Sequence, residues 1–576
     1  MPMMTADEHS GAPPLTLPAL IMTSVAHRPN QPALWRCVDA RFEPVTYRAL
    51  ALAAWRIARQ LTERGITPQA RVAIAVTDRF SWGVSCLGVL FSGATAVPID
   101  PLLKPAEIGS ILNDADVALI LHDGRIDLGD QAESKKVVPL DSIWPGFAAE
   151  GDLSDIRLPA VPPSALATII FTSGTTGRTK GVMLSHGNIV GDILGVEAMG
   201  LLDSSDILLS VLPIHHAFEF TAGFLYPLAI GAQVAFARSL KSRDILSDLG
   251  ANRATVILAV PILFENIVNS IRAKAAAAGI LRRSMFTTLL SISRKGRRIG
   301  WRRSGRVLFG SMRKKAGLDS LRILVSGGAA LPPFVAEFCD SIGLPLIQGY
   351  GLSETSPVVS VNRPTRYRYD TVGPPIPTAE VKIIDARPDG IGEIAVRGPM
   401  VMQGYWRQPE ETAKVMRDGW FLTGDLGAID PDGHVRICGR SKNVIVTGAG
   451  KNVYPEEVEA VLCARPEIAE AVVYGQSRPG KIGESVAAVV VPDKEWFESN
   501  FPQVWTDDAS LQLTMTETVK EACESLANFK RVGDVQVQRE PFEKTSSRKV
   551  KRYLVTHGQG EKYSSVFASS PQNPQC

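Results

Sequence analysis

The chain has only seven cysteines among its 576 residues, and no two of them form a CxxC pair. Scattered cysteines of odd number argue against a disulfide framework and against a cysteine-ligated zinc site, and they indicate a reducing compartment. A secretory signal is also missing. The first segment, MPMMTADEHSGAPP, has acids where such a signal has bases, and no early apolar block follows. We therefore expect a cytoplasmic protein.

Uninterrupted apolar segments are absent as well. Residues 82–99 and 220–237 carry no charge and reach the length of a membrane span, but glycine and proline interrupt both. Each consists of an apolar run, a Gly-Ala step and a short β-like run. This form predicts a buried helix followed by a buried strand, and its recurrence predicts α/β architecture.

The composition is otherwise that of a globular protein. Hydrophobic residues make up 45% and charged residues 21%, which excludes a wholly disordered chain. Strand-like runs at 72–76, 168–171, 255–260 and 321–326 alternate with helix-like segments. After a strong turn signal at 430–433, shorter elements predict a smaller α+β domain.

Acidic residues are missing from one long segment. The net charge of the chain is only +3, yet residues 272–315 contain 14 Lys and Arg and no Asp or Glu. Apolar residues between 280 and 292 occur at roughly helical spacing. The pattern predicts a basic amphipathic helix, which suits an anionic membrane surface; a solvated helical face or a patch for polyanionic ligands are the alternatives. No nucleic-acid-binding module accompanies it, so nucleic acid is not expected as a partner.

A loop rich in glycine and hydroxyl groups, FTSGTTGRTKG at 171–181, follows an apolar strand and precedes VMLSHGNIV, which is predicted to begin a helix. Glycines let backbone N–H groups approach phosphate oxygens, and hydroxyls and a lysine add hydrogen bonds and charge. The loop therefore predicts triphosphate binding. Neither Walker A nor GxGxxG spacing is present, which argues against an ordinary P-loop enzyme and a dinucleotide-binding fold. The predicted phosphate-binding residues are Thr172, Ser173, Gly174, Thr175, Thr176, Gly177 and Lys180.

Further motifs follow in a fixed order along nearly the whole chain. They are TYRAL at 46–50, LPIHHAFEF at 212–220, SGGAAL at 326–331, QGYGLSETSP at 348–357, GWFLTGDLG at 419–427, GRSKNVIVTGAGKNVYPEEVE at 439–459 and EKTSSRKVKR at 543–552. With the loop, this set resembles the adenylate-forming superfamily of acyl-CoA synthetases, peptide-synthetase adenylation domains and luciferases.

The resemblance implies an α/β fold with a large N-terminal domain of packed α/β subdomains and a β-rich subdomain, followed by a small mobile α+β C-terminal domain. The expected organisation is a disordered N-terminus over 1–15, an adenylation domain over 16–438 with a basic insertion at 272–315, a mobile domain over 439–555 and a disordered tail over 556–576.

For ATP, the resemblance implies that Glu354 binds Mg²⁺, an ion that prefers hard oxygen ligands and bridges to phosphates. It also implies that Thr355 contacts a phosphate and that Tyr350 stacks on the adenine. Asp425 would accept hydrogen bonds from the ribose hydroxyls, and Arg440 would be a second contact to the ribose or to a phosphate. The remaining nucleotide-binding positions would be Gly328, Gln348, Gly349 and Gly351.

For catalysis, the resemblance implies that Lys549 stabilises charge on the phosphoryl group when a carboxylate attacks the α-phosphate. Arg548 stands where the family usually has glycine, and Thr179 stands where it usually has proline. Lys442 falls at the hinge about which the small domain rotates between half-reactions. The loop with Gly448 and Gly450 would accept the pantetheine arm, although it reads GAGKN where many relatives have GGEN.

The adjacent histidines His215 and His216 are expected to point in different directions, with no acidic or cysteine cluster to join them, so a metal pair is not expected. The resemblance makes His216 a catalytic-site residue at the wall of the acyl pocket. The H-x-F-E form at 216–219 and the basic insertion resemble the long-chain fatty acid branch.

The predicted function is ATP- and Mg²⁺-dependent activation of a long-chain fatty acid to its acyl-adenylate, followed by thioester formation with CoA as co-substrate. One alternative acceptor is the phosphopantetheine arm of an acyl carrier protein. The other alternative is a fatty-acid-binding relative without catalysis. Peripheral membrane contact through 272–315 would help the protein collect fatty acids dissolved in lipid.

Overall fold

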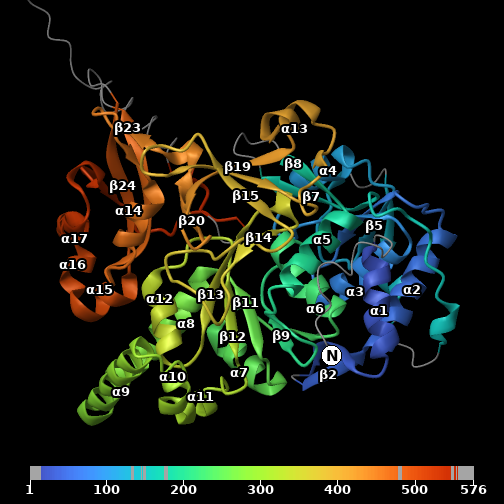
Figure 1. Cartoon of the computed structure of the whole chain (residues 1–576), viewed down its shortest axis with the longest axis horizontal. Coiled ribbons are helices and arrows are strands. Elements are labelled where there is room, and N and C mark those ends of the chain that lie inside the picture. The colour runs from blue at the N-terminus through green and yellow to red at the C-terminus, as the bar shows by residue number, and fades with distance from the viewer. Residues whose placement is uncertain are drawn as a thin grey trace, which may run out of the picture. The chain divides into compact units, whose positions relative to one another are not determined.

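The computed structural model describes residues 15–39, 41–130, 135–144, 146, 151–173, 179–477, 483–545, 550–552 and 554–555. The chain forms two compact units, which are described separately (Figure 1). The first comprises residues 1–382, 395–423 and 430–435, and the second comprises residues 383–394, 424–429 and 436–576. The fold is therefore a mixed α/β protein with a large N-terminal part and a smaller C-terminal part, as predicted.

The first unit contains an eight-stranded sheet with the strand order β14-β13-β12-β11-β9-β10-β1-β2. Its six central strands are parallel, and an antiparallel strand closes each edge. The strands are β1 (Pro32–Val38), β2 (Arg41–Thr46), β9 (Ile207–Ser210), β10 (Gln233–Phe236), β11 (Val256–Ala259), β12 (Ile323–Ser326), β13 (Leu346–Gly351) and β14 (Val358–Val361).

A second sheet of the same unit has seven strands in the order β17-β8-β7-β4-β3-β5-β6. It is parallel from β7 to β6, and β8 and β17 continue it antiparallel. The strands are β3 (Arg71–Ala75), β4 (Thr95–Pro98), β5 (Leu119–His122), β6 (Lys136–Pro139), β7 (Leu166–Ser173), β8 (Thr179–Ser185) and β17 (Gly404–Tyr405).

Helices cover these sheets, so that strands such as β4, β11 and β12 are buried along their whole length. The helices are α1 (Leu17–His27), α2 (Tyr47–Glu63), α3 (Arg79–Phe91), α4 (Pro105–Asp114), α5 (His186–Glu197), α6 (Tyr226–Ala229), α7 (Ser242–Asn252), α8 (Pro261–Ala277), α9 (Ile280–Arg298), α10 (Ser304–Leu308), α11 (Gly310–Lys315), α12 (Pro333–Ser341) and α13 (Pro409–Val415). A π-helical segment, Phe218–Leu225, leads directly into α6.

Both uncharged segments form the predicted helix and strand. Gly93 and Gly231 follow α3 and α6 at φ +74° and +81°. In each case the next residue donates its N–H to a carbonyl five residues back, from Ala94 to Val89 and from Ala232 to Pro227. This C-terminal motif ends the helix and turns the chain directly into β4 or β10. No helix in the described part of the chain is long and apolar enough to cross a membrane.

The prediction that VMLSHGNIV begins a helix is wrong for its first residues. Val182–Ser185 complete β8, and α5 begins only at His186. The Ser185 hydroxyl accepts a hydrogen bond from the Asn188 backbone at 3.1 Å, and the Asn188 side chain accepts one from the Ser185 backbone at 2.9 Å. This reciprocal cap fixes the start of the helix at the end of the apolar run.

A five-stranded sheet has the order β15-β16-β19-β18, with β20 paired to β19. The predicted turn at 430–433 joins β19 to β20. The strands are β15 (Glu380–Ile384), β16 (Gly392–Arg397), β18 (Met416–Arg417), β19 (Trp420–Ile429) and β20 (Val435–Arg440).

The second unit is α+β and has its own core around Phe497 and Met515. Its three-stranded sheet comprises β23 (Ile468–Ser477), β24 (Glu484–Pro492) and β25 (Asp534–Val537), and a short ribbon comprises β21 (Ile445–Val446) and β22 (Asn452–Val453). The helices are α14 (Pro455–Leu462), α15 (Lys494–Asn500), α16 (Pro502–Thr506) and α17 (Asp508–Ala522).

Candidate functional site

The arms of the predicted phosphate loop are the paired strands β7 and β8, in which Thr172 lies opposite Lys180. The Thr172 hydroxyl donates to the Lys180 carbonyl at 3.4 Å. Ser173 ends β7, and its backbone pairs with Thr179. Of the predicted phosphate-binding positions, Gly174, Thr175, Thr176 and Gly177 lie outside the described residues.

The structure brings Lys180 together with Glu354, two residues that are 174 positions apart in sequence. The Lys180 Nζ atom lies 4.7 Å from the centre of the Tyr405 ring. The Tyr405 hydroxyl donates to Glu354 Oε1 at 2.9 Å. Tyr405 therefore links the loop lysine to the predicted Mg²⁺ ligand.

Glu411, at the start of α13, is the ion-pair partner of Lys180, with 2.6 Å between Nζ and Oε2. Lys414 also contacts the Glu411 carboxylate. Hydrogen bonds from Lys180 and then Lys414 lower the pKa of Glu411 to about 2, so the carboxylate stays charged at any physiological pH. Neither Glu411 nor Tyr405 was predicted, because both lie outside the motifs and only the tertiary fold brings them to Lys180 and Glu354.

Glu354 and Thr355 occupy a short 3₁₀ turn that follows β13. Thr355 is fully buried, and its hydroxyl accepts from the Leu352 N–H at 3.0 Å and donates to the Pro357 carbonyl at 2.8 Å. These bonds hold the turn that presents Glu354. The predicted phosphate contact of Thr355 stays a prediction.

The residues predicted around adenine lie at or just after the carboxyl ends of two neighbouring parallel strands. Gln348, Gly349, Tyr350 and Gly351 belong to β13, and Gly328 follows β12 at φ +82°. At Gly351, an added Cβ atom would lie 1.7 Å from the Pro357 carbonyl oxygen, so only glycine fits between β13 and the Glu354 turn. Ligands of open α/β sheets bind at this end of the strands.

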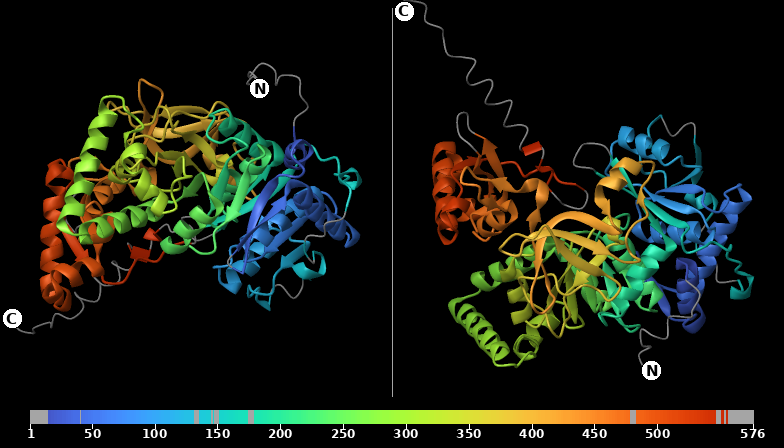
Figure 2. Two further views of the ribbon diagram at one scale, coloured as in Figure 1. Left: turned by 90° about the horizontal axis from the view of Figure 1, so that it is seen from below. Right: turned by 45° about the horizontal axis from the view of Figure 1, so that its top comes forward.

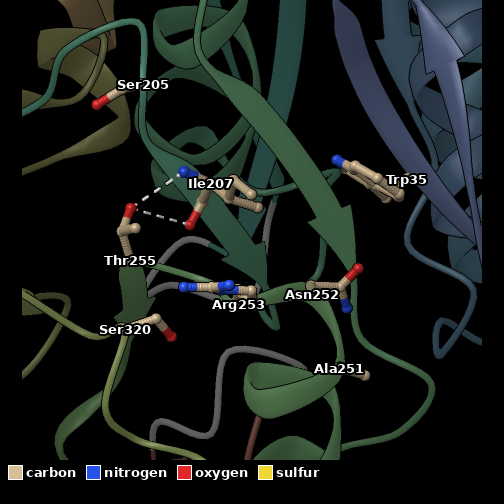
Figure 3. A pocket seen from close by; sticks show the side chains of 8 residues that line it. All are labelled: Trp35, Ser205, Ile207, Ala251, Asn252, Arg253, Thr255 and Ser320. Atoms are coloured by element: carbon tan, nitrogen blue, oxygen red, sulfur yellow. Dashed lines mark hydrogen bonds between the residues drawn. The ribbon is translucent and has the colours of Figure 1, made fainter.

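A cavity of about 540 Å³ lies at the opposite ends of the same strands (Figure 3). It is next to the amino ends of β9, β11 and β12, where Thr255 hydrogen-bonds to both the N–H and the carbonyl of Ile207. Its position excludes it as the site that contains Tyr350 and Glu354. The lining residues are Trp35, Ser205, Ile207, Ala251, Asn252, Arg253, Thr255 and Ser320.

One expectation about the histidines is corrected. Asp100, which follows β4, joins His215 and His216, and one ligand atom of each lies within 4.8 Å of the other two. The distance from His215 Nε2 to Asp100 Oδ1 is 3.5 Å. Two imidazoles and a carboxylate are a donor set that a divalent transition-metal ion can use. Asp100 was missed because it is 115 positions from His215 and only the tertiary fold unites them.

The glutamate of the H-x-F-E motif, Glu219, is fully buried in the π-helical segment. Burial raises its pKa to about 7, and the positive charge of Arg79 opposes this shift. The Arg79 guanidinium donates to the carbonyls of Ser210 and Ala237, which end β9 and follow β10. Phe218 of the same segment packs against Gly327, where an added Cβ would lie 2.9 Å from its ring.

In the second unit, the predicted ribose residues Asp425 and Arg440 form an ion pair with 2.7 Å between Oδ1 and Nε. Asp425 is buried and Arg440 is exposed, so the pair joins a buried carboxylate to a guanidinium at the surface. Asp425 lies on β19 and Arg440 ends β20, which are adjacent strands.

The hinge and thiol-acceptor positions are also in the second unit. Lys442 is exposed in a 3₁₀ turn after β20. Gly448 and Gly450 are exposed in the turn between β21 and β22, and Gly450 has φ +69°. The predicted catalytic Lys549 lies outside the described residues; Lys544 and Val550, before and after it, pair as an antiparallel bridge.

Sequence comparison extends over both units. The sequence model described as AMP-binding enzyme matches residues 21–406, and that described as AMP-binding enzyme C-terminal domain matches residues 457–549. The chain is 30% identical to the long-chain-fatty-acid–CoA ligase FadD15 of Mycobacterium tuberculosis, over 93% of this chain and 94% of the relative. It is also 30% identical to a feruloyl-CoA synthase of Amycolatopsis, over 78% of this chain and 84% of that protein.

Comparison with solved structures also finds similarity over nearly the whole chain. ATP-bound MatB from Rhodopseudomonas palustris is similar over 95% of this chain and 100% of its own, with a TM-score of 0.75 and 26% sequence identity.

Proposed function

The chain belongs to the AMP-binding enzyme family and is an adenylate-forming acyl-CoA ligase, and from this premise we propose that the acid it activates is a long-chain fatty acid. Acid and ATP form an acyl-adenylate and release pyrophosphate. The CoA sulfur then attacks the acyl carbon, AMP leaves, and a thioester forms.

One observation carries the proposal for the first step: Tyr405 links Lys180 to Glu354. A positively charged loop arm and a hard carboxylate at one place suit the triphosphate of ATP, because the ammonium neutralises phosphate charge. Glu354 fits Mg²⁺, since one of its oxygens is fixed by Tyr405 and the side chain is only half-buried. Bound Mg²⁺ would offset the charge of the pyrophosphate leaving group.

Thr172, Ser173, Gly174, Thr175, Thr176 and Gly177 would bind phosphates, Tyr350 would stack on adenine, and Gly328, Gln348, Gly349 and Gly351 would line it. Asp425 would accept hydrogen bonds from the ribose, and Arg440 would stand beside it. We assign Lys549 to the developing charge at the α-phosphate. Thr355 and His216 complete the proposed catalytic set, with His216 beside the acyl group. Lys442 is the proposed hinge, and Gly448 and Gly450 are the proposed pantetheine contact.

The long-chain assignment is supported by the H-x-F-E segment and the basic insertion at 272–315, which we propose contacts a membrane peripherally. The relatives named above differ in the acids their names state, so the acid is the part of the proposal most in need of a direct test.

An acyl carrier protein is the second candidate acceptor. The exposed basic surface at 272–315 favours it, because carrier proteins tend to be acidic and charge complementarity accelerates encounter. CoA remains the proposed acceptor.

The test is pyrophosphate release with Mg-ATP and fatty acids from short to long, with CoA, with a holo carrier protein, or with neither. Turnover that needs a long-chain acid and CoA is expected. Turnover only with the carrier protein would show that the carrier protein, and not CoA, is the acceptor. Turnover only with aromatic acids would show that the substrate is not a fatty acid. Fatty acid binding without any release would favour the non-catalytic alternative.

A further inference from the structure

Among the described helices of the first unit, α9 packs against α8, α10 and α12 (Figures 1 and 2). Its packed face has Phe286, whose ring centre lies 5.7 Å from that of Phe309 and 6.5 Å from that of Phe338. Leu289 and Leu290 join the same core. This face therefore fixes which side of the helix remains exposed.

Buried polar bonds and close backbone contact anchor the helix further. The Ser293 hydroxyl donates to the Ser341 carbonyl at 2.7 Å, and Arg297 forms an ion pair with the buried Asp340. At Gly305, an added Cβ would lie 2.5 Å from the Gly343 nitrogen, so α10 touches the backbone at the end of α12. The segment is thus a preformed part of the fold.

The side of the helix next to this packed face, which we call the outer face, exposes aliphatic side chains. Leu281, Met285 and Ile292 are 86%, 60% and 45% exposed, and their spacing of four and seven residues places them in one stripe. Ile299, just after the helix, and Val307 in α10 are also exposed. Single exposed apolar residues are common, but an aligned stripe of them marks an interaction surface.

The charged residues of the segment 272–315, which carries the stripe, are all basic. Arg294 pairs with Glu337, Arg297 pairs with Asp340, and Arg313 is buried and donates to carbonyls. The other basic residues of 272–315 are exposed, and none has a carboxylate of the described residues within 4 Å. They are Arg272, Lys274, Arg282, Arg283, Lys295, Arg298, Arg302, Arg303, Arg306, Lys314 and Lys315.

We propose that the outer face of α9 docks on an anionic phospholipid surface. The stripe of Leu281, Met285 and Ile292 would enter the boundary between headgroups and acyl chains, and the flanking Arg and Lys would contact lipid phosphates. The inference rests on the proposed function in one respect: it gives a ligase of long-chain acids direct access to substrate dissolved in lipid.

Lipid fits this surface better than a protein partner. The stripe stands on a convex helix and consists of flexible aliphatic side chains, whereas protein interfaces gather aromatic residues around complementary pockets. A bilayer needs no such pocket and accepts a convex stripe anywhere along its surface. Because α9 is already held by Ser293 and Arg297, docking does not require a helix to form on the membrane.

The test uses the full chain and sedimentation with vesicles of phosphatidylcholine alone or mixed with phosphatidylglycerol. Two triple variants probe the surface, Leu281→Ser/Met285→Ser/Ile292→Ser and Arg282→Gln/Lys295→Gln/Arg298→Gln. Exposed positions elsewhere give matched controls, Leu513→Ser in α17 and Lys241→Gln/Arg243→Gln at α7. Pyrophosphate release with a short, soluble acid reports separately on folding and on the catalytic site.

We expect the wild-type protein to bind only the anionic vesicles and to lose affinity as salt is raised. Removal of these three basic charges should weaken binding by about two orders of magnitude, since each basic residue near such a surface contributes about a factor of five. The serine variant should weaken it by at least about tenfold, and the controls should bind as the wild-type protein does.

Equal binding to both vesicle types, or binding that neither triple variant weakens, would overturn the inference. Absence of vesicle binding, together with binding of a holo carrier protein that depends on the same three basic residues, would overturn it in favour of a protein partner. Vesicle binding with the expected pattern but no pyrophosphate release from any acid would uphold the docking surface and reject the proposed function.

Discussion

At the scale of single residues, Lys180 is the group on which the proposed ATP site depends most directly. Its Nζ atom pairs with Glu411 at 2.6 Å and lies over the Tyr405 ring. Replacing it by alanine removes a charge-assisted bond to phosphate, which is worth about 1.5–3 kcal/mol. Lys180→Ala should therefore raise KM for Mg-ATP by about 10- to 100-fold in steady-state kinetics.

Lys414→Ala is the matched control, since Lys414 binds the same Glu411 carboxylate and does not belong to the loop arms. Its KM for Mg-ATP should stay within about threefold of the wild-type value. An equal rise of KM for Mg-ATP in both variants would mean that the ion pairs of Glu411 with Lys180 and Lys414 support folding of this region. Lys180 would then have no separate role with ATP.

His186 gives a prediction about pH. It is fully buried, neither ring nitrogen has a hydrogen-bond partner in the described part of the chain, and burial lowers its pKa to about 4. The unfolded chain therefore binds a proton first as pH falls below about 6.5. The contribution of His186 to the free energy of unfolding is complete above that pH and should decrease by about 3 kcal/mol on the way to pH 4.

Urea unfolding of wild type and His186→Phe between pH 7 and pH 4 measures this contribution as a difference, in which other titrating groups such as Glu219 cancel. The gap between the two proteins should change with pH, whereas exposed His27→Gln should follow the wild type throughout. A gap that stays constant with pH would contradict the argument.

At the scale of helices and strands, the C-terminal motif that ends α3 and α6 also ends α7. The residue in the left-handed conformation decides how stable this motif is. Arg253 occupies this position after α7 at φ +50°, and Ala254 donates to the Leu249 carbonyl as in the glycine cases. A left-handed conformation costs a non-glycine residue about 1–2 kcal/mol. Arg253→Gly should therefore raise the free energy of unfolding by about 0.5–1 kcal/mol, after the entropy lost by glycine.

Gly343 is the converse case. It has φ +80°, and an added Cβ would lie 2.3 Å from the Arg306 nitrogen. Gly343→Ala should lower the free energy of unfolding by more than about 2 kcal/mol, and Gly279→Ala, which meets no atom within 4 Å, should change it little. Denaturant titration measures the free energy of unfolding of all three variants. A lower value for Arg253→Gly than for the wild type would show that the Arg253 side chain makes a contact that stabilises the fold by more than the backbone conformation costs.

Elements whose signals are local could be predicted from the sequence. The Gly93 and Gly231 steps and the turn at 430–433 depend on a few adjacent residues, and each is confirmed. The error after the phosphate loop also has a local cause: Val182–Ser185 are apolar enough for either structure, and only pairing with β7 makes them a strand. The widened π-helical turns at Phe218–Leu225 have no sequence pattern of their own.

The site was predicted less completely, because several of its contacts join distant residues. Motifs identified Lys180 and Glu354 individually, but Tyr405, which links them, lies outside every motif named. Asp100 likewise reaches His215 only through the position of β4 in its sheet. The roles of Asp425, Arg440 and Lys442 remain predictions, as does that of Lys549.

At the scale of the whole molecule, the proposed reaction has two half-reactions that use different groups. Lys549→Ala should lower the rate of pyrophosphate release by at least about 100-fold, because a positioned cation no longer stabilises charge at the α-phosphate. The reaction of supplied acyl-adenylate with CoA should remain within about threefold of the wild-type rate. Rapid-quench assays of each half-reaction measure the two rates.

Arg548→Ala and Lys551→Ala are the controls for identity, since both are basic neighbours of Lys549. Each should retain pyrophosphate release within about tenfold of wild type. If Arg548→Ala alone abolished it, the catalytic cation would be Arg548, and the alignment of the 543–552 motif would have to move by one residue.

The pairing of Lys180 with Glu411 also has a consequence for how ATP affinity responds to ionic strength. Before ATP binds, Glu411 serves as the lysine's internal counter-ion, so fewer salt ions need to gather there. When a phosphate of ATP pairs with Lys180, the Glu411 carboxylate loses that partner but keeps its ion pair with Lys414, so its charge is still compensated. Binding then exchanges one bound anion for another and releases few ions to solution. We therefore expect ATP affinity to vary weakly with salt, and to vary more strongly in Glu411→Gln, where dissolved anions must take the place of the carboxylate.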